Sequence, residues 1–367
     1  RHFINAFVGS FAMIYTGLIA RKVGGWRTGC IAVLIMMLSA RFVGNCMNNP
    51  KDIPFALGYT ASIYYMLAFI EQLPRPSKWT SLFLSASIAI TIGTRAGGII
   101  LFFYLLLFSC VSLLQTYLSK QAKQTLTPAF FSLLSVILLS YLGGLLFWPY
   151  GLANPLIHPF LALQQFSNFQ VFRMSTLFEG FLIEVAHPPT HYLFEWILIT
   201  TPFLFLTGLG VFLIAFKAAI KHFSVRGLIF LAWTAFFPLV YILIKKSTLY
   251  DSWRHALFIY PPLVAISALG WEFLLRFSSS QKKGSLVLLF FLVQAFEPLN
   301  WMIRNHPHEY VYFNPIVGGL PGAFKNFESD YWGNSLRQGA EWLAYYHLLH
   351  HPGKRAVVRA EGSPTEP

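Results

Sequence analysis

Residues 3–20, FINAFVGSFAMIYTGLIA, form an uncharged and almost wholly apolar run that decides the class of fold. A hydrocarbon core about 30 Å thick requires roughly 20 such residues per helix, and lipid offers no hydrogen-bond partner to an unpaired backbone group. Because such runs recur, we predict an all-α polytopic membrane protein with about ten transmembrane helices. The predicted spans are residues 3–20, 28–46, 55–73, 79–95, 97–116, 128–148, 193–216, 227–245, 256–275 and 285–303.

The composition agrees with this class. Of the 367 residues, 56% are hydrophobic and 11% are charged, whereas a soluble domain has about 25% charged residues. The net charge of +13 is spread over small basic groups between apolar runs, so we expect no nucleic-acid partner. The 3 cysteines show neither metal-ligand nor disulfide spacing and are expected to be small core residues.

The basic residues predict the orientation of the chain. One alternate set of loops carries Lys and Arg without acids, which is typical of the cytoplasmic side. The opposite loops mix both signs of charge. The predicted cytoplasmic cations are Arg21, Lys22, Arg27, Arg75, Lys78, Lys120, Lys123, Lys217, Lys221, Arg226, Arg276, Lys282 and Lys283.

The chain divides into a transmembrane domain at residues 1–303 and a polar tail at 304–367, which we expect to be a small soluble unit outside the membrane. Within the first domain, residues 149–192 form a long aromatic loop on the outer side. Its middle part, residues 160–185, is apolar at mixed spacing and predicts a helix along the membrane surface. A loop of this length is usually functional or disordered, and its hydrophobicity argues against disorder.

The outer loop NNPKDIPFA at residues 48–56 is the first candidate site, because Lys51 and Asp52 stand between Pro50 and Pro54. The prolines restrict the backbone and would hold Asp52 at the mouth of a helix pair. A carboxylate there could accept a proton or bind a metal ion. The alternative is an ordinary helix-capping aspartate with Lys51 as its partner.

Two further outer segments carry cations that suit an anionic ligand. Arg95 lies in IGTRAGG, residues 92–98, where its planar guanidinium could clamp a phosphate. In KKSTLYDSWRHALFIYPP, residues 245–262, Asp251 accompanies four potential cations, which are expected to bind a lipid or substrate phosphate. These cations are Lys245, Lys246, Arg254 and His255. The alternative for both segments is contact with lipid headgroups.

The segment HPPTHY at residues 187–192 is a weak candidate for a divalent metal site. His187 and His191 are four residues apart, but Pro188 and Pro189 prevent a helical pair of ligands. These histidines could bind a divalent ion together with Asp52, and the sequence suggests no other cofactor. Motifs of soluble hydrolases and nucleotide-binding enzymes do not occur in the sequence.

Four segments in this order resemble a known superfamily: RHFINAFVGSFAMIYTGLIARKVGG, ARFVGNCMNNPKDIPFA, IGTRAGG and WRHALFIYPP. They are similar to the bacterial branch of the protein O-mannosyltransferase-like membrane glycosyltransferases, glycosyltransferase family 39. Aminoarabinose transferases and RgtA-like enzymes are relatives. The resemblance covers about residues 1–303, and residues 310–343 look like an extension found in some of these proteins.

The resemblance implies a GT-C fold and transfer of a sugar from a polyprenyl-phosphate carrier to a lipid, glycan or protein acceptor. It implies a bacterial inner-membrane protein whose active site faces the periplasm. Asp52 corresponds to the second acidic residue of the family site, and Lys51, Arg95, Arg254 and His255 would bind the donor phosphate. The first acidic residue has no counterpart, so we expect a fragment that lacks one of eleven helices.

Two other functions use the same features. A polyprenyl-phosphate transporter or flippase would need the phosphate-binding cations but no carboxylate chemistry. A structural subunit of an envelope-assembly complex would tolerate loss of both Asp52 and Arg254. The inverting transferase is the favoured hypothesis.

Overall fold

The computed structural model describes residues 2–118, 126–167, 175–278, 280–355 and 358. The predicted cytoplasmic residues Lys120 and Lys123 and the end of the tail lie outside this part. The main helices are α1 (His2–Gly24), α2 (Trp26–Met37), α3 (Ala40–Asn48), α4 (Asp52–Gln72), α5 (Lys78–Thr94), α6 (Ile100–Leu118), α7 (Leu126–Leu146), α10 (Tyr192–Thr200), α11 (Phe203–Ile214), α13 (Val225–Lys245), α14 (Tyr260–Arg276), α15 (Gln281–Asn305) and α17 (Leu336–His350). The remaining elements are α8 (Pro149–Ala153), α9 (His158–Ser167), α12 (Phe216–Ala219), α16 (Gly319–Ala323), β1 (Ser175–Phe178), β2 (Phe181–Glu184) and the 3-10 helices η1 (Ala96–Ile99), η2 (Arg254–Ile259), η3 (Glu309–Val311) and η4 (Pro315–Val317).

Helix α14 forms the centre of the bundle, because every residue from Tyr260 to Glu272 is buried. It packs against α1, α2, α11 and α13. The contact with α11 is close enough to exclude a side chain, since a Cβ added at Gly270 would lie 1.9 Å from the Gly208 carbonyl oxygen. Small residues allow such backbone approach where lipid supplies no hydrophobic drive between helices.

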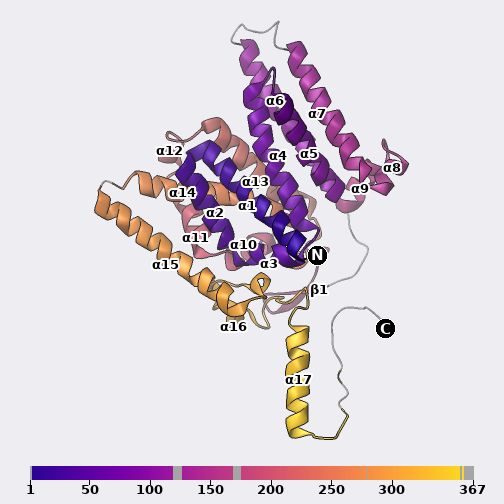
Figure 1. Ribbon diagram of the computed structural model, residues 1–367, viewed down its shortest axis with the longest axis vertical. Helices are drawn as coiled ribbons and strands as arrows, with labels where there is room; N and C mark the ends of the chain where they lie inside the picture. The colour runs from indigo at the N-terminus through magenta and orange to yellow at the C-terminus, as the bar shows by residue number, and fades with distance from the viewer. Residues whose placement is uncertain (1, 119–125, 168–174, 279, 356–357, 359–367) are drawn as a thin grey trace.

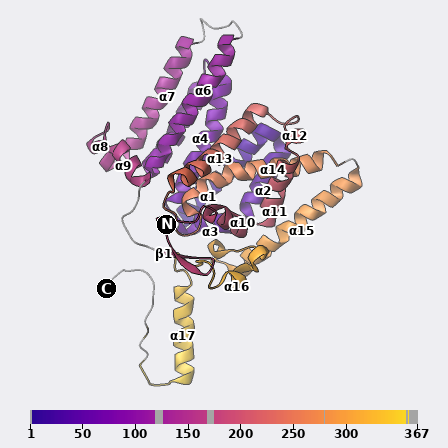
Figure 2. The ribbon, with the colours of Figure 1, turned by 180° about the vertical axis from the view of Figure 1, so that it is seen from behind.

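The remaining helices surround this centre (Figure 1). Helices α4 to α7 lie side by side on one flank, where α5 packs on both α4 and α7. Helix α15 lies on the other flank. Only 11% of the residues in its most apolar stretch are buried, whereas 83% are buried in the corresponding stretch of the span that contains α14. The outer helices therefore present their apolar side chains to lipid. From behind, α13 and α14 lie together above the hairpin (Figure 2).

Within the part of the chain that the structure describes, seven helices are long and apolar enough to cross a membrane, or up to nine if each of two bent pairs is one span. Helix α5, with 17 residues, is shorter than these spans and corresponds to the segment predicted at 79–95. The all-α polytopic fold is therefore confirmed.

Two predicted spans are bent rather than straight. The span predicted at 28–46 divides into α2 and α3, which meet at 66°, and that at 193–216 divides into α10 and α11, which meet at 118°. Breaks leave backbone carbonyls without helical partners. At the second break, Asn314 Nδ2 donates to the carbonyls of Leu198 and Thr201 at 2.6 and 2.8 Å. Pro202, between α10 and α11, disfavours a helical conformation at Thr201, and the distant Asn314 stabilises the bend.

The surface helix predicted at 160–185 is wrong in its second half. Helix α9 ends at Ser167, and residues 168–174 lie outside the described part. Strands β1 and β2 then pair antiparallel, with Phe178 opposite Phe181. Both turn residues, Glu179 and Gly180, have positive φ angles of 50° and 79°, which matches the twist of a two-residue hairpin turn.

The predicted tail does not begin as a separate unit. Residues 310–314 are buried, and Tyr310 packs so closely on α3 that a Cβ at Gly44 would lie 2.2 Å from its backbone nitrogen. The backbone N–H of Glu328 donates to the Leu177 carbonyl in the hairpin at 3.0 Å. Helix α17 projects away from the bundle (Figure 1).

Candidate functional site

The loop between α3 and α4 fixes the position of Asp52. The Asn49 side chain accepts hydrogen bonds from the backbone N–H groups of Lys51 and Asp52 at 3.3 and 2.9 Å. Its amide nitrogen donates to Asp52 Oδ2 at 2.7 Å. Asp52 is the first residue of α4 and is buried. Asn49 therefore holds both the turn and the carboxylate.

Helix α1 contacts this loop through the side chain of Asn5. Asn5 Nδ2 lies 3.3, 2.8 and 3.0 Å from the carbonyl oxygens of Asn45, Cys46 and Asn49. These carbonyls lie at the end of α3, where the Asn45 carbonyl also accepts from the Asn49 backbone N–H at 2.8 Å. A single buried amide thus fixes the end of α3 relative to α1.

Arg95 reaches Asp52 from the end of α5. Its Nη2 forms an ion pair with Asp52 Oδ1. The backbone then turns sharply into η1, and Gly98 permits that turn because a Cβ there would lie 2.7 Å from the Ile92 nitrogen. The glycines of IGTRAGG therefore shape the break that presents Arg95.

Arg254, at the start of η2, approaches the same carboxylate. Its Nε lies 3.6 Å from Asp52 Oδ2 and 3.4 Å from Asp251 Oδ2. Both distances exceed those of an ordinary N–H···O hydrogen bond, about 2.7–3.2 Å. The side chains of Asp52, Arg95 and Arg254 are only 4%, 8% and 9% exposed. The arginine is therefore buried without close hydrogen bonding to either acid.

Three aromatic rings surround the Arg254 guanidinium. The guanidinium carbon lies 4.9 Å from the Tyr250 ring, 4.5 Å from Tyr331 and 5.6 Å from Trp332. Such contacts stabilise a cation electrostatically, and more strongly when water is excluded. Tyr331 and Trp332 come from the segment between α16 and α17, so the tail forms one wall of the site.

We call Lys51, Asp52, Arg95, Asp251 and Arg254 the charged cluster. Burial raises the pKa of Asp251 to about 7, although Arg254 and Arg41 pull it downward. The pKa of Lys51 is lowered, first by burial and then by repulsion from Arg95, while Asp52 opposes the shift. With three cations facing two carboxylates, the cluster carries an excess of positive charge that suits an anion.

The other predicted phosphate ligands lie nearby in different settings. The His255 ring packs edge-on against Tyr250 with centroids 4.5 Å apart. Its Nδ1 is buried without a hydrogen-bond partner among the described residues. Lys246 follows the last residue of α13 and has a left-handed conformation with φ 47°. It lines a cavity that none of the charged cluster lines.

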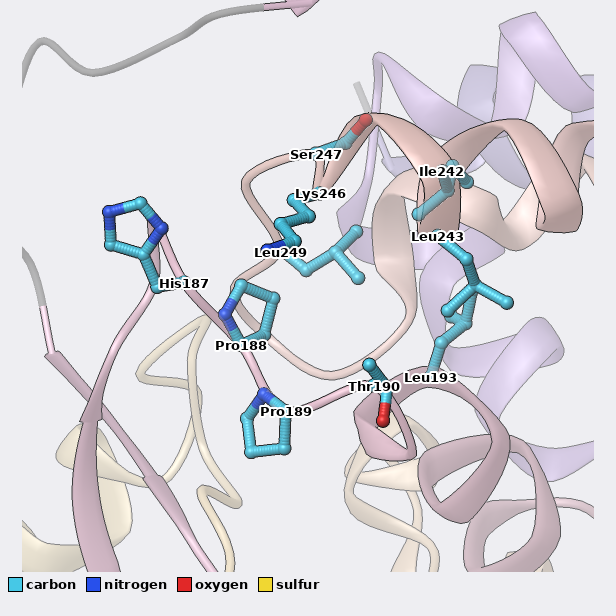
Figure 3. Close-up of a pocket in the computed structure, with 10 residues that line it drawn as sticks. All are labelled: His187, Pro188, Pro189, Thr190, Leu193, Ile242, Leu243, Lys246, Ser247 and Leu249. Carbon is cyan, nitrogen blue, oxygen red and sulfur yellow. The ribbon is translucent and has the colours of Figure 1, made fainter.

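That cavity has a volume of about 390 Å³ (Figure 3). Apolar residues of α10 and α13 line its helical side, and Figure 3 shows Lys246 and Leu249 opposite the Pro188–Pro189 segment. Because Leu249 precedes Asp251 in one short loop, the same loop borders both the cavity and the charged cluster. An apolar space with a lysine at its rim suits an amphiphile that carries a negative charge.

The two predicted metal candidates are separated. His191 Nε2 lies 3.4 Å from Glu179 Oε2 and 3.8 Å from Glu195 Oε2, whereas His187 lines the cavity of Figure 3. Among the described residues, His191, Glu179 and Glu195 form a group with metal-ligand chemistry. Asp52 does not belong to it, because its oxygens face Arg95, Asn49 and Arg254. Metal dependence stays a prediction.

Sequence reasoning missed Asn49, Arg41 and the aromatic wall of the tail. Arg41 is buried in α3, where it donates to Ser252 Oγ at 3.0 Å and to the Tyr312 carbonyl at 3.3 Å. It thereby connects the loop of Asp251 with the tail. Asn49 stands three residues before Asp52 in NNPKD, a spacing typical of side-chain capping, and could have been found. The tail contacts leave no local signal.

Comparison with known proteins shows which families and structures the chain resembles. Residues 2–151 match the profile of a family described as dolichyl-phosphate-mannose-protein mannosyltransferase. This part includes Asp52 and Arg95. The predicted resemblance to the GT-C membrane glycosyltransferases is confirmed. Sequence comparison with curated proteins gives no match.

A solved structure has a similar fold. The crystal structure of ArnT from Cupriavidus metallidurans bound to undecaprenyl phosphate aligns over 95% of this chain and 57% of that one, with a TM-score of 0.50 and 15% identity. The apo crystal structure of ArnT covers 95% and 55%, with a TM-score of 0.46 and 15% identity. The chain therefore spans just over half the length of ArnT, and the likeness concerns the fold alone.

Proposed function

We propose that this chain carries the donor site of a glycosyltransferase that moves a hexose or pentose from a polyprenyl-phosphate carrier to a lipid, glycan or protein acceptor. The observation that carries the proposal is the convergence of Arg95 and Arg254 on Asp52 at one end of a membrane bundle. Buried charges at such positions are costly and mark functional sites. The family match and the ArnT fold supply the reaction class.

Arg254 is the best-placed ligand for the carrier phosphate. Its contacts with Asp52 and Asp251 are long, at 3.6 and 3.4 Å, so a phosphate can replace them at little cost. The guanidinium fork binds phosphate oxygens in pairs. Arg95 and Lys51 add positive charge beside it, and His255 lies on the same turn. Together they stabilise the charge on the departing phosphate.

Asp52 receives the proton of the acceptor in this proposal. The acceptor hydroxyl oxygen forms a bond to the anomeric carbon while the bond from that carbon to the carrier phosphate oxygen breaks. The hydroxyl proton passes to Asp52, and the electron pair leaves with the phosphate. A single displacement of this kind inverts the anomeric configuration. Asn49 and Arg95 fix the carboxylate for that task, and no step requires a metal ion.

The cavity of Figure 3 and the basic loops indicate where the carrier lipid would lie. The cavity of Figure 3 borders the loop of Arg254 and is lined mainly by apolar side chains, which supports docking of the first part of the polyprenyl chain there. The basic loops lie at the end where Lys22 meets Glu71 and Arg27 meets Glu272. By the positive-inside rule that end is cytoplasmic, so the site would face the periplasm of a bacterial inner membrane.

A vesicle experiment separates transfer from transport. The full chain is placed in liposomes with an undecaprenyl-phosphate-linked sugar, with and without an envelope lipid extract that supplies acceptors. The transferase proposal predicts release of undecaprenyl phosphate only when the extract is present. Movement of the sugar-linked lipid across the bilayer without acceptor, and without release, would instead establish a transporter.

A further inference from the structure

A second cavity, separate from the one in Figure 3, lies beside the loop that positions Asp52. Its volume is about 230 Å³. It is formed where the start of α1, the α3–α4 loop and the tail meet. The residues that line it are His2, Asn5, Met47, Asn48, Pro50, Trp332 and Asn334.

The lining combines one large aromatic ring with several hydrogen-bonding groups. The His2 Nδ1 lies 2.8 Å from the Met47 carbonyl, which can only accept, so Nδ1 is the donor of this hydrogen bond. Asn48 donates from Nδ2 to the Gly44 carbonyl at 3.3 Å, and its Oδ1 is a further acceptor. Acceptors beside an indole ring suit a ligand rich in hydroxyl groups.

The cavity is joined to the charged cluster through two residues. The Trp332 ring lies 5.6 Å from the Arg254 guanidinium carbon. Pro50 precedes Lys51 and Asp52 in the same loop. A molecule in this cavity therefore lies next to the groups assigned to the carrier phosphate and to proton transfer.

The tail residues of the cavity are held in place. The Asn334 backbone N–H donates to Tyr310 Oη at 3.3 Å, and Tyr310 in turn donates to Asp330. The Ser335 N–H donates to Asp330 Oδ2 at 3.1 Å. Because Tyr310 is buried against Gly44 in α3, these hydrogen bonds fix residues 330–335 and hold Trp332 in a defined position.

We infer that this cavity is a carbohydrate subsite in which the Trp332 ring contacts one face of a sugar ring. The inference rests on the proposed function, since it places a sugar next to Asp52. No lining residue is an acid, Lys or Arg, so the site is not built for a phosphate or a peptide charge. A volume of about 230 Å³ gives room for a single sugar ring.

The experiment uses the full chain in nanodiscs and measures saturation-transfer NMR with methyl mannoside, methyl galactoside and methyl arabinoside. Wild type, Trp332→Ala, Trp332→Phe and Trp342→Ala are compared. Trp342 is a matched control, because it lies on α17 and is 63% exposed. Thermal unfolding is measured on the same samples and reports whether each variant is folded, and binding of undecaprenyl phosphate is measured with wild type.

The subsite predicts a signal from at least one glycoside with wild type, Trp332→Phe and Trp342→Ala. Loss of the aromatic face in Trp332→Ala should weaken that binding about tenfold while the variant remains folded. The absence of any glycoside signal with wild type, or equal binding by Trp332→Ala, would overturn the subsite. Absence of undecaprenyl phosphate binding by wild type would instead count against the proposed function.

A further titration distinguishes the two sources of the sugar. Undecaprenyl phosphate is compared with the same lipid carrying mannose. If Trp332→Ala weakens the mannose-bearing lipid more than undecaprenyl phosphate, the subsite holds the donor sugar. If this variant changes the binding of both lipids by the same factor while the free glycoside no longer binds, the subsite holds the acceptor sugar. Both results support a carbohydrate subsite.

Discussion

The two ends of the helical bundle treat charge in opposite ways. At the basic end, Lys22 pairs with Glu71 at 2.6 Å, and Arg27 forms a two-pronged pair with Glu272 at 2.6 and 2.7 Å. Each of these acids meets one cation at close range. At the other end, Arg254 lies 3.6 and 3.4 Å from two carboxylates, and its Nε has no hydrogen bond among the described residues.

The difference separates structural pairs from a binding site. A close pair at a helix end satisfies both partners and leaves nothing for a ligand. A buried arginine with only long contacts retains donors that a ligand can use, although its burial costs free energy. Arg254 is buried in this way at the end of the bundle that carries Asp52, Arg95 and the aromatic wall of the tail.

The strongest test of the comparison replaces one acid at each end. Asp52→Asn should lower sugar transfer on the order of 10³-fold, since general-base catalysis typically contributes 10²–10⁴-fold. Glu71→Gln removes the same charge from a side chain that is 57% exposed and should leave transfer unchanged. Release of undecaprenyl phosphate from the sugar-linked lipid is the measurement. Equal turnover of the two variants would remove Asp52 from the reaction.

A second test concerns the cation that joins the site to the tail. Arg41→Ala should destabilise the fold by about 3 kcal/mol, because it leaves Ser252 and the Tyr312 carbonyl without their buried donor. Thermal unfolding in detergent measures the effect, with Lys22→Ala as the control at the other end. If Arg41→Ala unfolds at the temperature of the control, the tail is not fixed by this residue.

The pH dependence sharpens the account of the charged cluster. The pKa of Asp251 is raised to about 7 by burial, with Glu328 and Asp52 adding to the rise and Arg254 and Arg41 opposing it. The folded state therefore binds a proton that the unfolded chain releases above about pH 4, so this group's contribution to stability is lost as the pH rises through 7.

The same proton should affect ligand binding. Neutral Asp251 no longer competes for Arg254, so undecaprenyl phosphate should bind several-fold more weakly at pH 8 than at pH 6. Asp251→Asn should flatten that profile. Comparison of the two profiles by titration cancels the ionisation of the ligand itself. Parallel profiles would show that Asp251 does not titrate in this range.

The smallest effect is expected from the exposed pair. Lys22→Gln should change stability by less than about 0.5 kcal/mol, because surface ion pairs contribute little. Lys22 and Glu71 are 26% and 57% exposed. Sugar transfer should also remain at the wild-type level. A large loss of either property would mean that the basic end is more than a set of structural pairs.

The sequence predicts the spans well because lipid imposes length and apolarity on each helix. Pro202 marks the second bend in the sequence, but the contacts of Ser39 with Tyr260 and of Asn314 with the Leu198 and Thr201 carbonyls, which stabilise the bends, leave no local signal. The sequence does not predict the hairpin because its apolar residues have mixed spacing, although Gly180 is a residue that such a turn favours.

The site follows the same division. Asp52, Arg95 and Arg254 are conspicuous in the sequence as charges at span ends, and the structure brings all three together. Tyr331 and Trp332 lie in a segment that composition marks as a soluble tail. Their contact with Arg254 depends on the burial of Tyr310 and its neighbours against α3. Only the folded chain shows that the tail belongs to the site.

The most direct test of the charged cluster is binding of undecaprenyl phosphate to the purified chain by native mass spectrometry. Arg254→Gln removes the buried cation, and Lys22→Gln removes a cation from the opposite end. Loss of a charge-assisted contact should weaken binding at least tenfold, about 1.4 kcal/mol, for Arg254→Gln, while Lys22→Gln should bind as wild type does. Equal affinities for wild type and Arg254→Gln would contradict the account.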